Sequence, residues 1–390
     1  MRLCIIFPPG YFPYPVRSGG STASFYIIDS LRISLDISII FTYKKKDIHH
    51  IQEITKIWND VKLHGFQYDK QFSLKMILCC FMPRKCKEIK DVSYMNFFCE
   101  ILKNNKFDIV QTEYYSGLHY INFIDPAIKT IFKHHEIRYI RNERLNQNIS
   151  KKDDFIKIKQ DEISVLNQYN TIITLSEIDK NILIKDGVTV PVYCSPGILN
   201  SSYNFHEEYR FQNKISYLAT GAHYPNREGL VWFMENIWEK VRVRHPEIEF
   251  IVIGKWKKSI VKKYKSVQFL GFVKDFSTVL QGSIMIVPIL SGSGIRIKIL
   301  DGINCGCPIV STSVGIEGLN FKDEIDCIIE DDVDMFVDRL YALMKDEEKQ
   351  KRLRKNAKTT LDKLYSNEVL IKRRLDIYLY NEEEKTYQNI

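Results

Sequence analysis

Several features of common protein classes are missing from this chain of 390 residues. It has no run of about 18 or more apolar residues, the length that a membrane-spanning helix needs. The apolar run Leu3–Phe7 is too short for a signal peptide and meets Pro8 at once. The nine cysteines show no paired spacing of the kind that holds zinc. We therefore expect a cytoplasmic chain whose cysteines are reduced thiols.

Two kinds of ligand are disfavoured by what the sequence does not contain. No basic stripe with interleaved aromatic residues stands out, so nucleic acid is not expected as a partner. No Gly-x-Gly-x-x-Gly follows the first apolar run, which disfavours a dinucleotide-dependent dehydrogenase. The net charge is +8, and residues 1–200 carry +6 of it (27 basic minus 21 acidic residues). This excess fits an anionic partner, such as a lipid headgroup or a phosphorylated acceptor, or merely a basic surface.

The length and the order of predicted elements indicate two domains. Short apolar runs alternate with helical patterns in the first half, at Leu3–Phe7, Ile37–Phe41, Phe107–Glu113, Thr130–Phe132 and Thr171–Leu175. The second half repeats this alternation, at Ile215–Ala219, Ile248–Ile253, Val267–Leu270, Ser283–Val287 and Ile309–Ser311. The pattern predicts two doubly wound α/β domains, each with a parallel sheet and crossover helices. We place them at 1–195 and 213–365, with a linker at 196–212 and a helical tail at 366–390 that can pack back on the first domain.

The most informative stretch is Ser291-Gly-Ser-Gly-Ile-Arg-Ile-Lys-Ile-Leu-Asp301, a glycine-rich turn that is predicted to run into a helix. Gly292 and Gly294 let a bulky anion approach the backbone closely. The amides of Ser293, Gly294 and Ile295 would then point outward at the positive end of the helix dipole. This turn is therefore a candidate cradle for phosphate, although an ordinary Gly-Ser turn before a helix is the alternative.

Three charged side chains follow the turn. Arg296 and Lys298 add two positive charges within one helical turn, and Asp301 offers a carboxylate that can accept hydrogen bonds from paired hydroxyls. An anion cradle, two cations and a diol acceptor together describe a site for a nucleotide diphosphate that carries a ribose. The alternative is that the basic residues are only solvated.

With these residues in hand, the chain resembles the retaining glycosyltransferases of the GT-B fold, and among them the large family four. The resemblance is strongest from Ile215 to Leu319, where four motifs occur in order: Gly221-Ala-His-Tyr-Pro-Asn226, Gly254, Leu270–Val273 and Ser291–Asp301. It implies two domains that face across a cleft, an acceptor-binding first domain and a nucleotide-sugar-binding second domain. In such relatives the segment that ends at Val273 contacts the base of the nucleotide. Asn226 is either a site residue or only a helix cap.

The first half matches the family more loosely. Gly19 and Gly20 occupy the position of a Gly-Gly loop that in relatives lies near the donor phosphates and the acceptor. His134-His135-Glu136 follows a strand where relatives carry a histidine close to the transferred sugar, and we assign that role to His135. An ordinary turn at the glycines and a structural histidine are the alternatives.

The resemblance implies transfer of a sugar, with retention of configuration, from a nucleotide-diphosphate donor to a glycan or lipid-linked acceptor in surface polysaccharide synthesis. Negative charge grows on the leaving phosphate, and the amides of 293–295 with Arg296 and Lys298 would stabilise it. No metal ion or cofactor is then needed.

Two departures from the family pattern keep a second hypothesis open. Asp301 stands where the family usually has Glu, and Ser293 stands where many relatives carry another Glu. A catalytically silent protein that binds nucleotide or a partner is the alternative function. Asp332-Val-Asp334 resembles a metal motif but is predicted to cap a helix. Phe72–Lys87, apolar and then basic, fits peripheral contact with an anionic membrane or a core helix.

Overall fold

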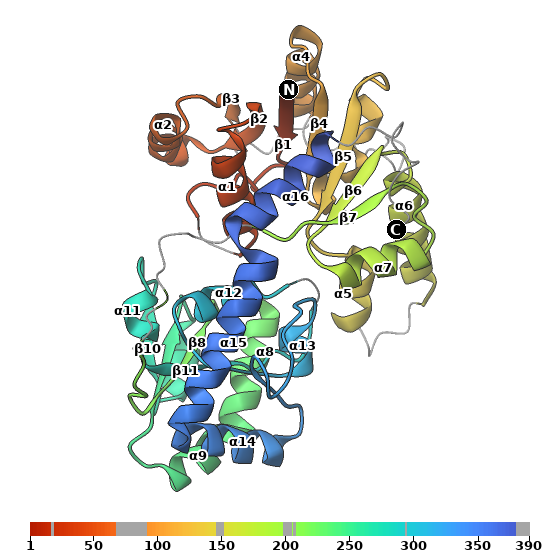
Figure 1. Ribbon diagram of the computed structural model, residues 1–390. Helices are drawn as coiled ribbons and strands as arrows, with labels where there is room; N and C mark the ends of the chain where they lie inside the picture. The colour runs from red at the N-terminus through yellow and green to blue at the C-terminus, as the bar shows by residue number, and fades with distance from the viewer. Residues whose placement is uncertain are drawn as a thin grey trace. The chain divides into compact units, whose positions relative to one another are not determined.

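The computed structural model describes residues 1–16, 19–67, 92–145, 152–197, 205, 208–292 and 295–379. The chain divides into an N-terminal unit, Met1–Ile198 with Leu370–Ile390, and a C-terminal unit, Leu199–Val369 (Figure 1). Over these described ranges, no helix is long and apolar enough to cross a membrane. The segment Phe72–Lys87, and Ser293 and Gly294 of the candidate cradle, lie outside the described residues.

Seven parallel strands form the sheet of the N-terminal unit, in the order β3-β2-β1-β4-β5-β6-β7. The strands are β1 (Arg2–Ile6), β2 (Asp36–Tyr43), β3 (Lys62–Gln67), β4 (Ile109–Glu113), β5 (Lys129–His134), β6 (Thr171–Thr174) and β7 (Val192–Cys194). The helices are α1 (Gly19–Leu31), η1 (Lys45–Asp47), α2 (Ile48–Ile57), α4 (Val92–Asn104), η4 (Tyr115–Phe123), α5 (Arg138–Leu145), α6 (Lys152–Leu166), α7 (Glu177–Lys185) and α16 (Asn367–Leu379). The chain's direction of travel across the sheet reverses between β1 and β4, which makes these strands the topological switch point.

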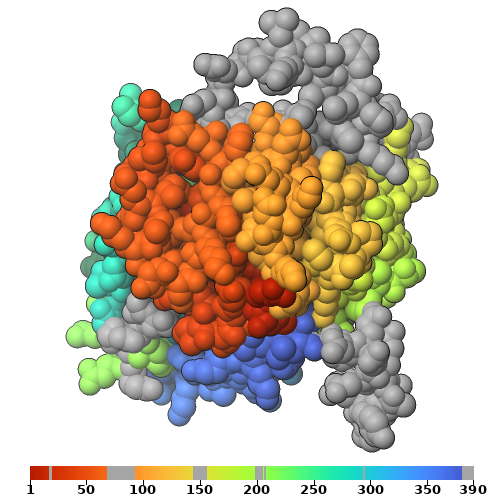
Figure 2. Space-filling model, turned by 90° about the horizontal axis from the view of Figure 1, so that it is seen from above, coloured from red at the N-terminus to blue at the C-terminus, as the bar shows by residue number. Residues whose placement is uncertain are grey.

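Apolar runs became buried strands, as their composition predicts. Residues 3–6 of β1 and all of β4 are buried. The edge strand β3 was not predicted, because its sequence Lys-Leu-His-Gly-Phe-Gln has no apolar run and none of its side chains is fully buried. In the space-filling view, the orange segment that holds β2 and β3 lies beside the yellow-orange segment of α4 and η4 (Figure 2).

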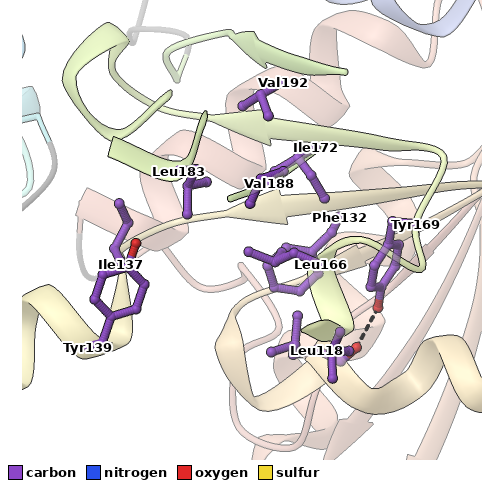
Figure 3. Packing of buried hydrophobic residues seen from close by; sticks show 11 residues of the cluster. Leu118, Phe132, Ile137, Tyr139, Leu166, Tyr169, Ile172, Leu183, Val188 and Val192 are labelled. Atoms are coloured by element: carbon purple, nitrogen blue, oxygen red, sulfur yellow. Dashed lines mark hydrogen bonds between the residues drawn. The ribbon is translucent and has the colours of Figure 1, made fainter. Parts of the chain in front are cut away.

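One apolar core of the N-terminal unit packs between the sheet and helices α6 and α7. Phe132, Leu166, Ile172 and Leu183 meet there with no exposed surface (Figure 3). The buried hydroxyl of Tyr169 donates to the Leu118 carbonyl at 2.7 Å, so its polar atom is satisfied inside the core.

The last described helix, α16, belongs largely to the N-terminal unit. Arg374 is fully buried, and its guanidinium donates to Ser195 Oγ at 2.9 Å and to the Ser195 carbonyl at 3.0 Å. Tyr378 donates from its hydroxyl to Gln111 Oε1 at 2.7 Å. These contacts tie the end of the described chain to strand β4 and to the residue that follows β7.

The C-terminal unit contains six parallel strands in the order β10-β9-β8-β11-β12-β13. They are β8 (Lys214–Leu218), β9 (Glu249–Ile253), β10 (Gln268–Gly271), β11 (Ser283–Val287), β12 (Ile309–Ser311) and β13 (Ile328–Ile329). Its helices are α8 (Tyr224–Phe233), η5 (Met234–Trp238), α9 (Glu239–Arg244), α10 (Lys258–Lys263), α11 (Ser277–Leu280), α12 (Ile297–Asn304), α13 (Ser313–Ile316), α14 (Val333–Lys345) and α15 (Glu347–Tyr365). Here the switch point lies between β8 and β11.

One continuous helical stretch begins at Tyr224 and runs through α8, η5 and α9. Pro225 sits in its first turn, where a residue without an amide hydrogen is tolerated. The middle segment, Met234–Trp238, is π-helical.

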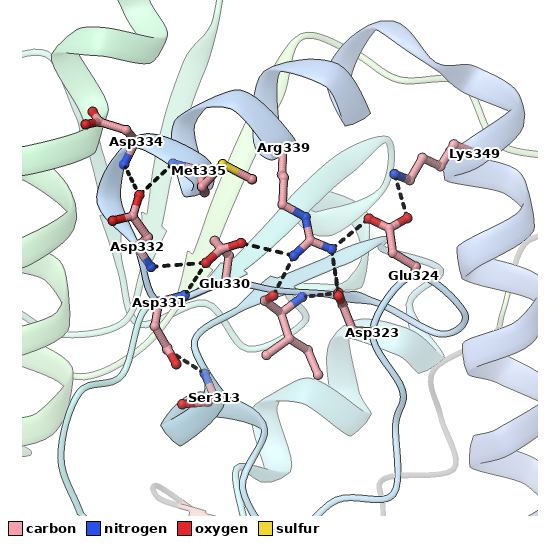
Figure 4. Close-up of polar contacts among 11 residues, drawn as sticks. Ser313, Asp323, Glu324, Glu330, Asp331, Asp332, Asp334, Met335, Arg339 and Lys349 are labelled. Atoms are coloured by element: carbon pink, nitrogen blue, oxygen red, sulfur yellow. Dashed lines mark hydrogen bonds and ion pairs between the residues drawn. The ribbon is translucent and has the colours of Figure 1, made fainter.

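The Asp332-Val-Asp334 motif caps a helix, as predicted. Asp332 is the N-cap of α14, and its carboxylate accepts from the amides of Asp334 and Met335 at 3.0 Å each (Figure 4). On the same helix, Arg339 pairs with Asp323 at 2.6 Å and with Glu324 at 2.7 Å. The acids around α14 are therefore used for structure. No group of three or more potential metal ligands occurs in the part of the chain that the structure describes.

Candidate functional site

The candidate site of the C-terminal unit lies where β8 and β11 end. Both strands are buried and parallel, so their carboxyl ends meet at one edge of the sheet. The loop after β8 leads into α8, and the loop after β11 leads into α12. These helices extend from the switch point, which is where doubly wound sheets bind ligands.

Helix α8 approaches the loop after β11 very closely. A Cβ on Gly229 would lie 2.2 Å from the carbonyl oxygen of Pro288, a distance that real Cβ atoms do not reach. Gly229 therefore allows this approach. Ser291 Oγ then donates to Glu228 Oε2 at 2.5 Å, which holds the start of the glycine-rich turn against α8.

Lys298 is oriented by a neutral partner rather than by a carboxylate. Its ammonium donates to Asn226 Oδ1 at 2.7 Å and lies 4.9 Å from the centroid of the Tyr217 ring. Asn226 in turn donates from Nδ2 to the Thr220 carbonyl at 2.9 Å. Within the described ranges, no Asp or Glu forms an ion pair with Lys298.

The same contacts correct one alternative from the sequence. Asn226 does not cap α8, because the N-cap is His223, whose side chain makes no capping bond. The Asn226 amide instead joins the loop after β8 to α12. The sequence offered no signal for this bridge, because 71 residues separate the two partners along the chain.

Burial shifts the charges of this site toward neutrality. It lowers the pKa of the Lys298 ammonium to about 7, and the nearby Arg296 guanidinium lowers it further in the same direction. Burial also raises the pKa of the Asp301 carboxyl to about 7. An anion bound beside Lys298 would favour its charged form, so ligand binding and protonation are coupled here.

The remaining predicted residues of this unit occupy the same edge of the sheet. Gly292 has a φ of +102°, and a Cβ there would lie 3.2 Å from Pro225 Cγ and 3.5 Å from Arg296 Nη2. Arg296 is the N-cap of α12, and half-buried Ile295 precedes it. Val273 is half-buried just after β10, which β9 separates from β8.

A second group of polar residues gathers at the carboxyl edge of the N-terminal sheet. Helix α1 begins at Gly19, and a Cβ on Gly20 would lie 3.1 Å from the Tyr114 hydroxyl. The Tyr114 ring stacks on His135 with centroids 3.7 Å apart and an interplanar angle of 10°. Tyr114 has a φ of +62°, a conformation that non-glycine residues rarely adopt and that often marks a functional site. The structure thus brings both Gly20 and His135 next to Tyr114.

The pleat of β5 separates the two histidines that the sequence could not tell apart. His134 Nε2 lies 2.8 Å from Glu162 Oε1 on α6, within the core. His135 Nε2 lies 2.7 Å from Glu113 Oε2, at the end of β4. The two histidines, one at the end of β5 and one just after it, therefore have different carboxylate partners.

Sequence reasoning missed three residues around His135, namely Glu113, Tyr114 and Lys133. The available signal was the alternation of polar residues at the ends of two buried strands. Gln111 and Glu113 are both buried, and so is Lys133 on the neighbouring strand. Buried charges are uncommon unless they are paired, which makes such positions worth singling out.

The comparisons with known proteins agree with this geometry. Residues 214–346 match the family described as "Glycosyl transferases group 1". These residues contain β8, α8, β11 and α12, and therefore the whole described site of the C-terminal unit. Together with the fold, the match supports a GT-B glycosyltransferase.

Individual relatives are distant but extend over the whole chain. An uncharacterized 44.6 kDa protein in the cps region of Klebsiella pneumoniae is 22% identical over 379 residues, which cover 91% of this chain and 94% of the relative. Sucrose-phosphate synthase from Thermosynechococcus elongatus has the same fold, with a TM-score of 0.75 and 11% identity over 97% of this chain and 98% of that one. A variant of S. aureus TarM, in complex with Fondaparinux, alpha-GlcNAc-glycerol and UDP, has a TM-score of 0.72 and 11% identity over 97% and 100%.

Proposed function

We propose that this protein is a retaining glycosyltransferase that moves a sugar from a nucleotide-diphosphate donor to a glycan or lipid-linked acceptor. The carrying observation is the Lys298 ammonium, which Asn226 holds at the switch point beside the first turn of α12. A cation without a carboxylate partner at a helix N-terminus suits a diphosphate. The family match over 214–346 and the UDP bound to the TarM variant support this choice of ligand.

The proposed chemistry follows from the charges of the site. The bond between the anomeric carbon and the diphosphate oxygen breaks, and the electron pair leaves with the phosphate. Arg296, Lys298 and the amides of 293–295 stabilise that charge, and no metal ion is needed in this scheme. A new bond forms from the acceptor hydroxyl on the same face of the sugar, and the leaving phosphate takes the hydroxyl proton.

Further roles are assigned in the same proposal. Asp301 accepts hydrogen bonds from ribose hydroxyls, Val273 and its neighbours contact the base, and Gly19 and Gly20 admit the donor phosphates. His135 lies close to the transferred sugar. The first domain, at 1–195, binds the acceptor, and the second, at 213–365, binds the nucleotide sugar.

The wider biological role rests on less direct support. The relative from a cps region favours a part in surface polysaccharide synthesis. We place the enzyme in the cytoplasm, and the basic excess of the first 200 residues favours peripheral contact with an anionic membrane.

Turnover of nucleotide sugars by the purified chain tests this proposal. Each donor is incubated with lipid-linked and free glycan acceptors, and the anomeric configuration of the product is read by NMR. The proposal expects one donor class to be consumed, with the configuration retained. An inverted product would overturn the retaining mechanism. Binding of a nucleotide without turnover of any donor would favour the catalytically silent alternative.

A further inference from the structure

The neighbouring strands β4 and β5 place four polar residues on one face of the N-terminal sheet. Their register pairs Glu113 with Lys133. Because side chains alternate along a strand, Gln111 lies on the same face as Glu113, and His135 follows Lys133 on that face. Helices α1 and α16 contribute Ser24 and Tyr378 to the same group.

The Glu113 carboxylate is the centre of this group. Lys133 Nζ lies 3.3 Å from Glu113 Oε2, with 0% of the lysine side chain and 1% of the glutamate side chain exposed. Gln111 Nε2 donates to Oε1 at 2.6 Å, and Ser24 Oγ donates to Oε2 at 3.2 Å. The carboxylate therefore has partners on both oxygens besides His135.

The charge of Glu113 determines which nitrogen of His135 carries the hydrogen. Burial alone would raise the pKa of Glu113, but Lys133 and His135 outweigh it and lower that pKa to about 2. Burial lowers the pKa of His135 to about 4 although its hydrogen bond to Glu113 opposes this shift. A neutral imidazole beside a carboxylate must place its single hydrogen on Nε2. The other ring nitrogen, Nδ1, is then a hydrogen-bond acceptor.

The surroundings leave that acceptor available. Among the described residues, no group hydrogen-bonds to His135 Nδ1, and the atom is not fully buried. The stacked Tyr114 ring restricts the tilt of the imidazole. A ligand hydroxyl at this edge of the sheet could therefore donate to Nδ1.

The last helix extends the network. The Tyr378 hydroxyl donates to Gln111 Oε1, and the amide of Gln111 donates to Glu113, which accepts from His135. Arg374 of the same helix adds a positive charge near Glu113 and Lys133. A hydrogen-bonded chain thus connects α16 to the imidazole through β4.

We infer that Glu113 and Lys133 are positioning residues, which hold His135 with its Nε2 hydrogen on Glu113 so that Nδ1 accepts a hydrogen bond from a substrate hydroxyl. The role of the hydroxyl rests on the proposed function, whereas the orientation of the ring does not. A buried ion pair is weak evidence for stability, because well-packed apolar residues often replace one without loss. The contact of Glu113 with His135 at the sheet edge explains this ion pair better than a contribution to stability does.

The first test is spectroscopic and needs no activity. The full chain is labelled with ¹⁵N-histidine, and the imidazole N–H protons are recorded by NMR. Two strongly deshielded, slowly exchanging protons are expected from the described part of the chain, where His134 and His135 donate to buried carboxylates. His135→Gln assigns one of them. The His134–Glu162 pair, at 2.8 Å, supplies the other and serves as an internal control.

The informative variant is Glu113→Leu combined with Lys133→Met, which removes the acceptor of the His135 hydrogen together with one charge of each sign. We expect the His135 proton signal to be lost and the His134 signal to remain. Retention of both signals would overturn the inference. Loss of both signals would show that the variant has unfolded. The single, charge-neutral Tyr378→Phe variant then decides: it is expected to speed exchange of the His135 proton alone.

Kinetics supply the second readout once a donor has been found. The paired variant should lower kcat about tenfold while the KM for the donor stays within about twofold. In a His135→Gln background the same change should cost nothing further, because residues that act as a unit are not additive. An additive loss would contradict positioning through His135. If no donor turns over at all, the proposed function fails while the NMR result still decides on the positioning pair.

Discussion

Each unit places a lysine at the carboxyl edge of its sheet, Lys133 fully buried and Lys298 half-buried, and the two lysines have different partners. Lys133 of the N-terminal unit faces the Glu113 carboxylate at 3.3 Å. Lys298 of the C-terminal unit faces the neutral Asn226 amide at 2.7 Å and the Tyr217 ring. The first charge is neutralised within the protein. Within the described ranges, the second charge faces only the neutral amide and the ring.

The ionisation of the two lysines reflects this difference. Burial lowers the pKa of Lys133 only to about 8, because the attraction of Glu113 opposes it. Burial lowers the pKa of Lys298 to about 7, and Arg296 adds to that shift. A paired charge suits the orientation of a neighbour, whereas a charge with a neutral partner suits anion binding.

The largest effect is expected from removing the charge of Lys298. Lys298→Gln keeps a donor for Asn226 but no cation, so turnover of the nucleotide sugar should fall about 10²–10³-fold, as when one preorganised donor is lost. Steady-state kinetics measure this loss. The matched control is Arg339→Gln, because Arg339 already pairs with Asp323, Glu324 and Glu330 and should leave turnover within about twofold. Equal losses of turnover in both variants would contradict a specific role for the Lys298 charge.

The next effect concerns the close approach that positions Lys298. Gly229→Ala would force α8 away from the Pro288 carbonyl, and we expect the free energy of unfolding to fall by about 2–3 kcal/mol. Denaturant unfolding measures it. The control is Gly117→Ala, where the new Cβ would meet its nearest neighbour at 3.6 Å, an ordinary contact. A Gly229→Ala protein as stable as the control would contradict the packing described here.

A smaller effect is expected in the pH dependence of ligand binding. Because the pKa of Lys298 is lowered to about 7, the free protein loses this charge as pH rises above 7, and a bound diphosphate must restore it. The affinity for UDP should therefore fall by up to about tenfold per pH unit between pH 7 and 9. Titration calorimetry measures this slope. The side chain of a Lys298→Arg variant stays protonated, so the affinity for UDP should depend less steeply on pH. An unchanged slope would show that a group other than Lys298 takes up the proton.

The smallest effect concerns the paired lysine's network. Tyr378→Phe removes one buried hydrogen bond to Gln111, so the free energy of unfolding should fall by about 1 kcal/mol. Thermal unfolding measures it against Tyr224→Phe, whose exposed hydroxyl bonds Glu228 at 3.2 Å and should contribute almost nothing. Equal values for the two variants would show that α16 does not brace β4 through this bond.

The sequence predicts the fold better than the sites. Each apolar run that was interpreted as a strand overlaps one. For the central strands the reason is that burial in a parallel sheet demands continuous apolar residues. Two edge strands were not predicted from the sequence, because Lys62–Gln67 is only half-buried and Ile328–Ile329 has two residues. Both lack the run of apolar residues on which such a prediction depends.

Residues whose roles depend on distant partners could not be predicted. The bond of Asn226 to Lys298 exists because the first turns of α8 and α12 meet at the switch point, and nothing in either segment specifies the other. The choice between His134 and His135 needed the pleat of β5 and the position of Glu162. The functional roles assigned to His135, Asn226, Lys298 and the other predicted site residues remain predictions.

Thermal unfolding of the full chain with UDP, GDP, ADP, CMP and TDP tests the central claim most directly. A ligand that binds only the folded protein stabilises it, by about 2.7 kcal/mol at a hundredfold excess over Kd. We predict that one diphosphate raises the melting temperature and that Arg296→Ala with Lys298→Ala abolishes the rise. No rise with any of the five, or an equal rise in the double variant, would contradict a diphosphate site at α12.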